Sequence, residues 1–214
     1  MRLIWLTCGA LAVNTYIIGA DDTKDCAVID PGEAAPVLER LNQEGLSCTH
    51  ILITHGHFDH IGGAAALKAA TGAKLMIHAD DAGKLSSNRD SLAMLIGQPL
   101  EKTEADGLLH DGDVVEAAGL SIRVLHTPGH CAGSVCYVLA HAQAIFCGDV
   151  LFLDGAGRTD FPGCSERVLY RSIVDKLYAL EGDYTVYCGH GEQTTLDHER
   201  AHNPLTTCGA RMGW

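Results

Sequence analysis

The sequence predicts an α/β protein, and three observations support this prediction. In the first half, short apolar runs typical of strands alternate with segments whose apolar residues recur at helical spacing. In the second half, most apolar runs are short and end at Gly, Asp or Pro, which indicates mainly strands. Histidine and aspartate residues directly follow several of these runs, so the candidate functional residues lie at strand ends.

The elements of the first half follow from local patterns. The expected strands lie at about residues 2–6, 12–18, 27–30, 50–54 and 74–77. Helices are expected over 33–44 and 62–70; Val37, Leu38 and Leu41 share one face of the first. Residues 79–109 are polar and irregular, so a loop or short helices are expected there, forming the roof of a site.

The second half consists mainly of expected strands. The expected strands are 113–117, 120–125, 134–139, 144–147 and 184–187. A long loop is expected over 148–164, and the spacing of Val168, Leu169 and Ile173 predicts a helix over 166–180. The chain shows no internal repeat, linker or low-complexity tract, so residues 1–214 are expected to form one domain.

Composition narrows the function classes. The net charge of −12 argues against a nucleic-acid partner, because phosphate binding requires clustered Lys and Arg. No apolar stretch is long enough to span a membrane. The apolar N-terminal run is interrupted at residues 14–16 and lacks a cleavage site, so it predicts strands rather than a secretion signal. The nine cysteines are dispersed and odd in number, which indicates free thiols and a cytoplasmic location.

The strongest functional signal is the segment 54–60. His55, His57, Asp59 and His60 fall within six residues at the end of an apolar strand. Side chains at i and i+2 leaving a strand point the same way, whereas residues beyond the bend can face a second centre. Crowding four titratable groups is unfavourable unless a cation compensates them. The segment therefore predicts a metal site.

Three later residues end apolar strands in a similar manner. His130, Asp149 and His190 each follow a glycine that comes after an apolar run. Each residue alone is weak evidence, because capping and surface residues share this pattern. Their recurrence together with the 54–60 segment indicates one shared site.

These motifs resemble the metallo-β-lactamase superfamily. The match extends from the hairpin at 9–18 and Asp30-Pro31-Gly32, through the metal motifs, to residues 199–204. Within the superfamily the chain is most similar to short glyoxalase II-like hydrolases, also called hydroxyacylglutathione hydrolase-like. The resemblance implies a four-layer αββα sandwich with metals at one edge of its two sheets.

The resemblance also implies a binuclear centre. It assigns one divalent ion to His55, His57 and His130, a second to Asp59, His60 and His190, and a bridging role to Asp149. Nitrogen and oxygen ligands suit Zn2+ and also iron or manganese. We expect Asp59 to have a second, catalytic task, which is to accept a hydrogen bond from the nucleophile and orient it.

The implied reaction is thioester hydrolysis by a metal-bridging hydroxide, on S-lactoylglutathione or a related acyl thioester. Two ions about 3.5–4 Å apart lower the pKa of a shared water from about 15.7 toward neutrality. An iron-dependent persulfide dioxygenase-like activity is the first alternative, with one iron held by His55, His130 and Asp149. A lactonase or other ester hydrolase and a non-catalytic metal-binding scaffold remain further alternatives. RNA-processing and lactam-cleaving activities are less favoured, and the oligomeric state is not predicted.

Other residues carry weaker expectations. Arg158 is a candidate to bind a substrate carboxylate, and an ion pair with Asp160 is an equally favoured role. Cys131 and Cys188 adjoin predicted ligands and are expected to point away from the metals. Four histidines are expected to be surface or core residues rather than ligands: His78, His110, His126 and His141.

Overall fold

The computed structural model describes residues 1–97 and 99–205, and its two six-stranded sheets pack face to face. The first sheet has the order β1 (Arg2–Cys8), β2 (Val13–Gly19), β3 (Asp25–Ile29), β4 (Ser47–Leu52), β5 (Lys74–His78) and β6 (Gly107–Leu109). The second has the order β14 (Thr194–Thr195), β13 (Thr185–Cys188), β10 (Ala144–Gly148), β9 (Val135–Leu139), β8 (Leu120–His126) and β7 (Val114–Ala117). A small hairpin pairs β11 (Leu151–Phe152) with β12 (Gly155–Ala156).

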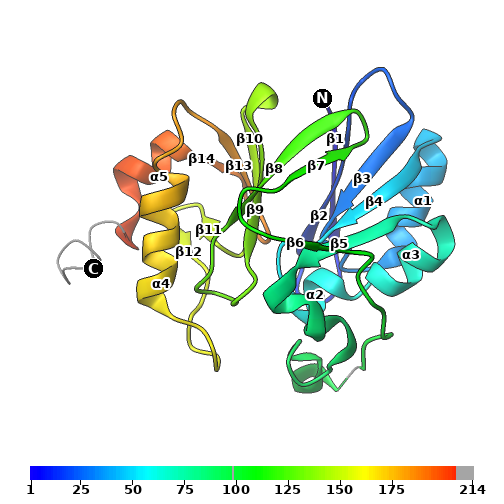
Figure 1. Cartoon of the computed structure of the whole chain (residues 1–214), viewed down its shortest axis with the longest axis horizontal. Coiled ribbons are helices and arrows are strands. Elements are labelled where there is room, and N and C mark those ends of the chain that lie inside the picture. The colour runs from blue at the N-terminus through cyan, green and yellow to red at the C-terminus, as the bar shows by residue number, and fades with distance from the viewer. Residues whose placement is uncertain (98, 206–214) are drawn as a thin grey trace.

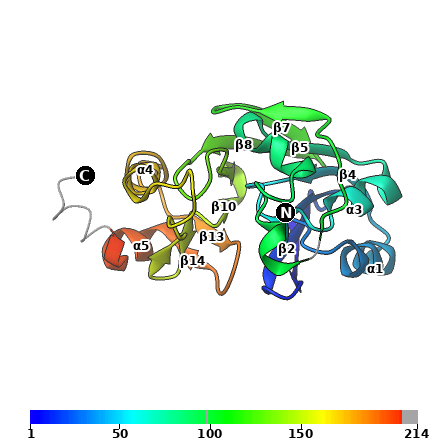
Figure 2. The ribbon, with the colours of Figure 1, turned by 90° about the horizontal axis from the view of Figure 1, so that it is seen from below.

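Helices cover the outer face of each sheet, as Figures 1 and 2 show. The first sheet is covered by α1 (Ala34–Glu44) and α3 (Ala64–Thr71), with α2 (Phe58–Ile61) at its edge. The second is covered by α4 (Glu166–Arg171), its π-helical continuation η4 (Ser172–Leu177) and α5 (Leu196–His202). Three short 3₁₀ helices complete the described secondary structure: η1 (Ala79–Ser86), η2 (Ala93–Ile96) and η3 (Ala140–Ala142). The predicted αββα sandwich is confirmed.

Alternation along the strands explains the layers. In β2, Tyr16 and Ile18 face the core between the sheets, whereas Ile17 faces the helices of the first layer. In β10, Phe146 faces the core between the sheets, and Ile145 faces the helices of the opposite layer. Successive strand residues point to opposite faces, so a strand buried on both sides must be apolar throughout.

Parallel pairing brings the functional segments to one edge. Strands β3, β4, β5 and β6 are mutually parallel, and in the second sheet β10 is parallel to β13. The carboxyl ends of parallel strands meet at the same edge of a sheet. The segments that follow β4, β10 and β13 therefore lie close together, although they are far apart in the sequence.

Several elements differ from the sequence-based expectations. The short strands β6 and β14 and helix α5 were not predicted, and the expected loop 148–164 contains the β11–β12 hairpin. Strands of two or three residues are too short to show a period. None of the helices in the described residues has the length and hydropathy of a membrane span. One domain over residues 1–214 stays a prediction, since residues 98 and 206–214 lie outside the described part.

Candidate metal centre

The structure brings all seven predicted ligands together at the shared edge of the two sheets. His55 and His57 lie between β4 and α2, and Asp59 and His60 belong to α2. The other three follow strands of the second sheet: His130 after β8, Asp149 after β10 and His190 after β13. Their role as ligands stays a prediction, and their geometry shows how well a metal would fit.

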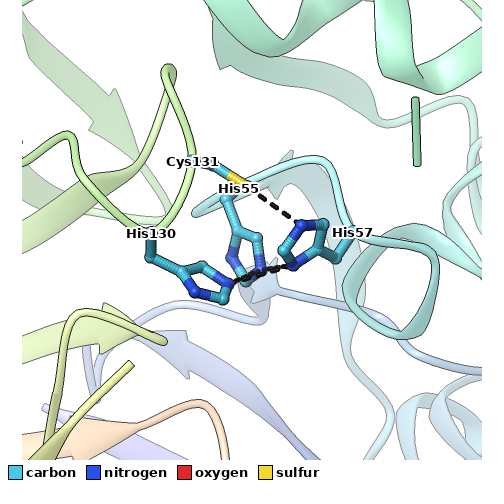
Figure 3. A group of neighbouring side chains, drawn as sticks. All are labelled: His55, His57, His130 and Cys131. Carbon is cyan, nitrogen blue, oxygen red and sulfur yellow. Dashed lines mark hydrogen bonds between the residues drawn. The ribbon is translucent and has the colours of Figure 1, made fainter. Parts of the chain in front are cut away.

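Three histidine nitrogens converge in the first group (Figure 3). His57 Nδ1 lies 3.1 Å from His55 Nε2 and 3.0 Å from His130 Nε2, and the latter two atoms are 3.3 Å apart. The rings are nearly perpendicular to one another, at 82–85°. A tetrahedral ion about 2.0–2.1 Å from each nitrogen separates its ligands by about 3.3 Å. The three atoms therefore fit one metal ion.

The outer nitrogens of these rings are held by the protein. His55 Nδ1 lies 3.2 Å from Thr54 Oγ1, and His130 Nδ1 donates to the carbonyl oxygen of Arg158 at 2.8 Å. A hydrogen bond from one ring nitrogen leaves the lone pair of the other nitrogen for a metal. Both rings are thus oriented with the free nitrogen toward the cluster.

A second group lies beside the first and shares Asp149. His190 Nε2 is 3.1 Å from Asp59 Oδ2 and 3.7 Å from Asp149 Oδ2. His60 Nε2 lies 3.3 Å from Asp149 Oδ1, yet both atoms are buried without a hydrogen bond among the described residues. Asp149 Oδ2 also lies 3.7 Å from His130 Nε2 of the first group. Unpaired buried polar atoms are unfavourable. A cation bound by both His60 Nε2 and Asp149 Oδ1 would satisfy these two atoms.

Electrostatics separate the two groups. Burial lowers the pKa of His57 to about 3 and also lowers the pKa values of His55 and His130, so these rings are neutral, as metal ligands must be. Burial opposes the charge on His60, but Asp149 and Asp30 together raise its pKa well above the usual range. Burial alone would raise the pKa of Asp149, but the contacts with His60, His190 and His130 together outweigh it and lower that pKa. The second group therefore favours a positive charge at its centre.

A sequence profile of the metallo-beta-lactamase superfamily matches residues 8–190. The chain belongs to this superfamily. Hydroxyacylglutathione hydrolase GloC of Haemophilus influenzae is 35% identical over 192 residues, which cover 86% of this chain and 89% of GloC. These findings show that this chain is a member of the metallo-hydrolase superfamily, whose members bind divalent metals.

Three solved structures of the superfamily superpose closely. The BLEG-1 B3 metallo-beta-lactamase has a TM-score of 0.91 and 34% identity, covering 96% of this chain and 100% of its own. TTHA1623 in a di-iron-bound form has a TM-score of 0.84 and 32% identity, with 94% and 99% covered. ETHE1 from Myxococcus xanthus has a TM-score of 0.78 and 30% identity, with 95% and 84% covered.

Asp30 is a supporting residue of this superfamily site that sequence reasoning did not identify. It is buried after β3, and its Oδ2 accepts hydrogen bonds from His60 Nδ1 at 2.8 Å and Thr54 Oγ1 at 2.6 Å. Its Oδ1 accepts from the backbone N–H of Thr54 at 2.7 Å. Asp30 thus directs His60 Nε2 into the second group and links it to the segment that carries the first. Its position after an apolar strand was the available signal.

Replacing Asp30 with asparagine is expected to lower metal affinity or activity about 10- to 100-fold, because the amide cannot accept all three hydrogen bonds. Metal content after dialysis and turnover of the same preparation measure this effect. Asp106→Asn is the matched control, since Asp106 also accepts a backbone N–H, from Leu75 at 2.9 Å, far from the centre. Equal behaviour of the two variants would show that Asp30 does not position His60.

Asp81 supports the site from η1, and no sequence signal identified it. Its fully buried carboxylate accepts from the backbone N–H groups of Gly56 at 2.7 Å and Gly133 at 2.9 Å. Lys84 Nζ pairs with it at 3.0 Å. Asp81 therefore ties together the two loops that carry the first metal group.

The thiol of Cys131 contacts a predicted ligand. Its Sγ lies 3.2 Å from His57 Nε2, the outer nitrogen of that ring, and its orientation relative to the metals stays a prediction (Figure 3). The buried position of Cys131 after His130 turns its side chain across the loop toward His57. The contact leaves His57 Nδ1 directed at the other two histidines. Cys188, by contrast, directs its Sγ toward the carbonyl oxygen of Val186.

Arg158 pairs with Asp160. Its Nε and one terminal nitrogen donate to the two carboxylate oxygens at 2.7 Å each, and its guanidinium lies 4.3 Å from the ring centre of Phe161. A substrate-binding role for Arg158 stays a prediction.

Of the four histidines expected not to be ligands, His78 and His126 stack at 4.0 Å with an interplanar angle of 13°. Ligand-type atoms of this pair and of Asp80 lie within 4.8 Å of one another, so the expectation that neither histidine is a ligand stays a prediction.

Proposed function

We propose that this chain is a binuclear metal-dependent hydrolase that cleaves acyl thioesters. The observation that carries the proposal is the pair of adjoining groups that share Asp149: a three-nitrogen cluster and a group with two unpaired buried atoms. We assign one Zn2+ ion to His55, His57 and His130, and a second to Asp59, His60 and His190, with Asp149 between them. Iron and manganese remain alternatives, and TTHA1623 binds two irons.

The chemistry follows from these positions. Bound divalent ions supply an activated water and polarise the carbonyl group of the substrate. Asp59 Oδ2 lies 3.1 Å from His190 Nε2, and we expect Asp59 to accept a hydrogen bond from the nucleophile and orient it toward the carbonyl carbon. No serine or cysteine nucleophile is needed, and the leaving thiolate needs little protonation.

The substrate proposal draws on the relatives of this chain. GloC is named a hydroxyacylglutathione hydrolase, which supports a glutathione thioester such as S-lactoylglutathione as a first substrate.

The net charge of −12 argues against a nucleic-acid partner. The eight cysteines in the described part of the chain are free, which supports the proposed cytoplasmic location; Cys208 lies outside the described residues.

The second candidate function is a persulfide dioxygenase-like activity. It is favoured by the similarity to ETHE1. A single iron on His55, His130 and Asp149 would, however, leave the unpaired nitrogen of His60 unsatisfied. The complete second group therefore favours the hydrolase. Hydrolysis of a lactone or a β-lactam also requires a polarised substrate carbonyl group. The similarity to BLEG-1 is the reason to assay β-lactam hydrolysis as well.

One preparation can test these functions together. Metal content is measured beside hydrolysis of S-lactoylglutathione, simple acyl thioesters, a lactone and a β-lactam, and beside oxygen uptake with glutathione persulfide. We expect two metal ions per chain and thioester hydrolysis that a chelator abolishes and Zn2+ restores. One iron per chain with oxygen consumption would overturn the hydrolase in favour of the dioxygenase.

A further inference from the structure

Two cavities of different character adjoin the candidate metal centre. A cleft of about 600 Å³ is lined by five of the predicted ligands, and a second cavity of about 450 Å³ is lined by two of the same residues, His57 and His130. Both cavities are lined by these two histidines and by Leu92 and Phe161. A substrate with two unlike ends could place one end on each side of the reacting carbonyl.

The larger cleft is walled by hydrocarbon. Its apolar lining consists mainly of Leu11, Phe58, Leu92, Leu95, Phe152 and Phe161. Leu11 is 50% exposed and Leu95 is 68% exposed. Large apolar side chains held open to water beside a catalytic centre gain stability when an apolar ligand covers them.

Polar groups for a hydroxylated acyl chain are scarce in this cleft. Apart from the predicted metal ligands, Arg158 is the one charged or polar side chain among its described lining residues. Two of its nitrogens are paired with Asp160, and its guanidinium lies over Phe161. A hydroxyl group placed against the leucine and phenylalanine walls would lose hydrogen bonds to water without replacement.

The smaller cavity is more polar than the larger cleft. Its lining includes Lys84 and Arg89 together with Asp80, Asp81 and Asp90. Asp80, Arg89 and Asp90 are exposed, and burying a hydrocarbon chain against them would remove water from their charges. This cavity suits the polar, thiol-bearing part of a thioester.

Leu92 lines both cavities and has an unusual backbone conformation. Its φ is +67° and its ψ is 7°, the left-handed region that leucine rarely adopts. The carbonyl oxygen of Ser91, the residue before Leu92, accepts a hydrogen bond from the backbone N–H of Phe58 at 2.9 Å. This bond anchors the segment to the helix that carries Asp59 and His60. Backbone strain of this kind concentrates at functional sites, where the surrounding structure maintains it.

We propose that the site selects thioesters with a hydrocarbon acyl group, and that Leu92 is the residue that separates the acyl cleft from the cavity for the thiol portion. The inference rests on the thioester hydrolysis proposed above and names its substrate class. Water adds to the carbonyl carbon, the C–S bond breaks, and the products are a carboxylic acid and a thiol, which receives a proton from the water. A hydroxyacyl group such as lactoyl is then a poorer substrate than a plain chain of similar or greater length.

The first test is a chain-length series on the metal-loaded enzyme. Acetyl, butanoyl, hexanoyl, octanoyl and lactoyl thioesters of one thiol, glutathione, are compared by kcat/KM. Each added methylene is expected to raise kcat/KM about fourfold until the cleft is filled, because transfer of each from water is favourable. Hydrolysis of none of them would overturn the proposed function itself. A flat or falling series, or a preference for lactoyl, would overturn this inference and leave the hydrolase standing.

The second test concerns Leu92. Leu92→Asn and Leu92→Gly both tolerate the left-handed backbone, so the fold is retained while the apolar wall is lost. The ratio of kcat/KM for octanoyl to acetyl thioester is expected to fall at least tenfold in both variants. Leu108→Asn is the matched control, because Leu108 is 53% exposed on the edge strand β6 and lines neither cavity. An unchanged ratio in the Leu92 variants, with thermal melting like that of the wild type, would show that Leu92 does not determine specificity.

Discussion

Asp149→Asn is expected to abolish turnover, with a loss of about a thousandfold or more, because metal ions supply several kcal/mol of transition-state stabilisation. Asp149 is the residue that faces both groups, with its carboxylate oxygens 3.3 Å from His60 Nε2 and 3.7 Å from both His130 Nε2 and His190 Nε2. In the variant, an amide nitrogen replaces one of the two carboxylate oxygens, and an amide nitrogen cannot ligate a metal ion. Metal content is therefore expected to fall from two ions to one or none.

Metal analysis and thioester hydrolysis on one preparation measure both effects. Asp21→Asn is the control, because Asp21 is an exposed carboxylate that pairs with the N-terminal amino group. It should keep both ions and full turnover. An Asp149→Asn enzyme that retains two ions and near-normal turnover would refute the bridging assignment, whatever substrate the enzyme prefers.

Asp59→Asn is expected to separate binding of metal from turnover. His60, His190 and Asp149 remain to hold the second ion, so part of the metal should stay bound. Burial would raise the pKa of Asp59, but its hydrogen bond with His190 and the charges of His60 and His190 together outweigh burial and lower that pKa, so the carboxylate is an acceptor at neutral pH. Asparagine weakens this acceptor, and groups that handle the reacting proton contribute roughly a hundredfold to ten-thousandfold in rate.

The measurement is kcat and KM beside metal content, with the wild type treated identically. We expect kcat to fall within that range while KM changes little. If turnover is unchanged, Asp59 has no role in orienting the nucleophile. If instead all metal is lost, Asp59 acts as a ligand, and its catalytic task is not separable from that role.

The supporting residues show where sequence reasoning reached its limit. Asp30 stands in a turn sequence that the superfamily resemblance includes, yet its hydrogen bonds to Thr54 and His60 depend on the pairing of β3 with β4. Asp81 lies in a segment without periodicity, and its partners Gly56 and Gly133 are 25 and 52 residues away. No local pattern encodes such distances.

Local sequence patterns predicted the longer strands, the main helices and the seven candidate ligands, because burial imposes a period of two or 3.6 residues and strand ends expose the residues that follow them. Only the tertiary structure decided which nitrogen of each ring faces the cluster, that Cys131 contacts His57, and that Leu11 and Leu95 wall one cleft. The physical reason is that these features depend on contacts between distant segments, whose geometry is set by sheet pairing and packing rather than by neighbouring residues.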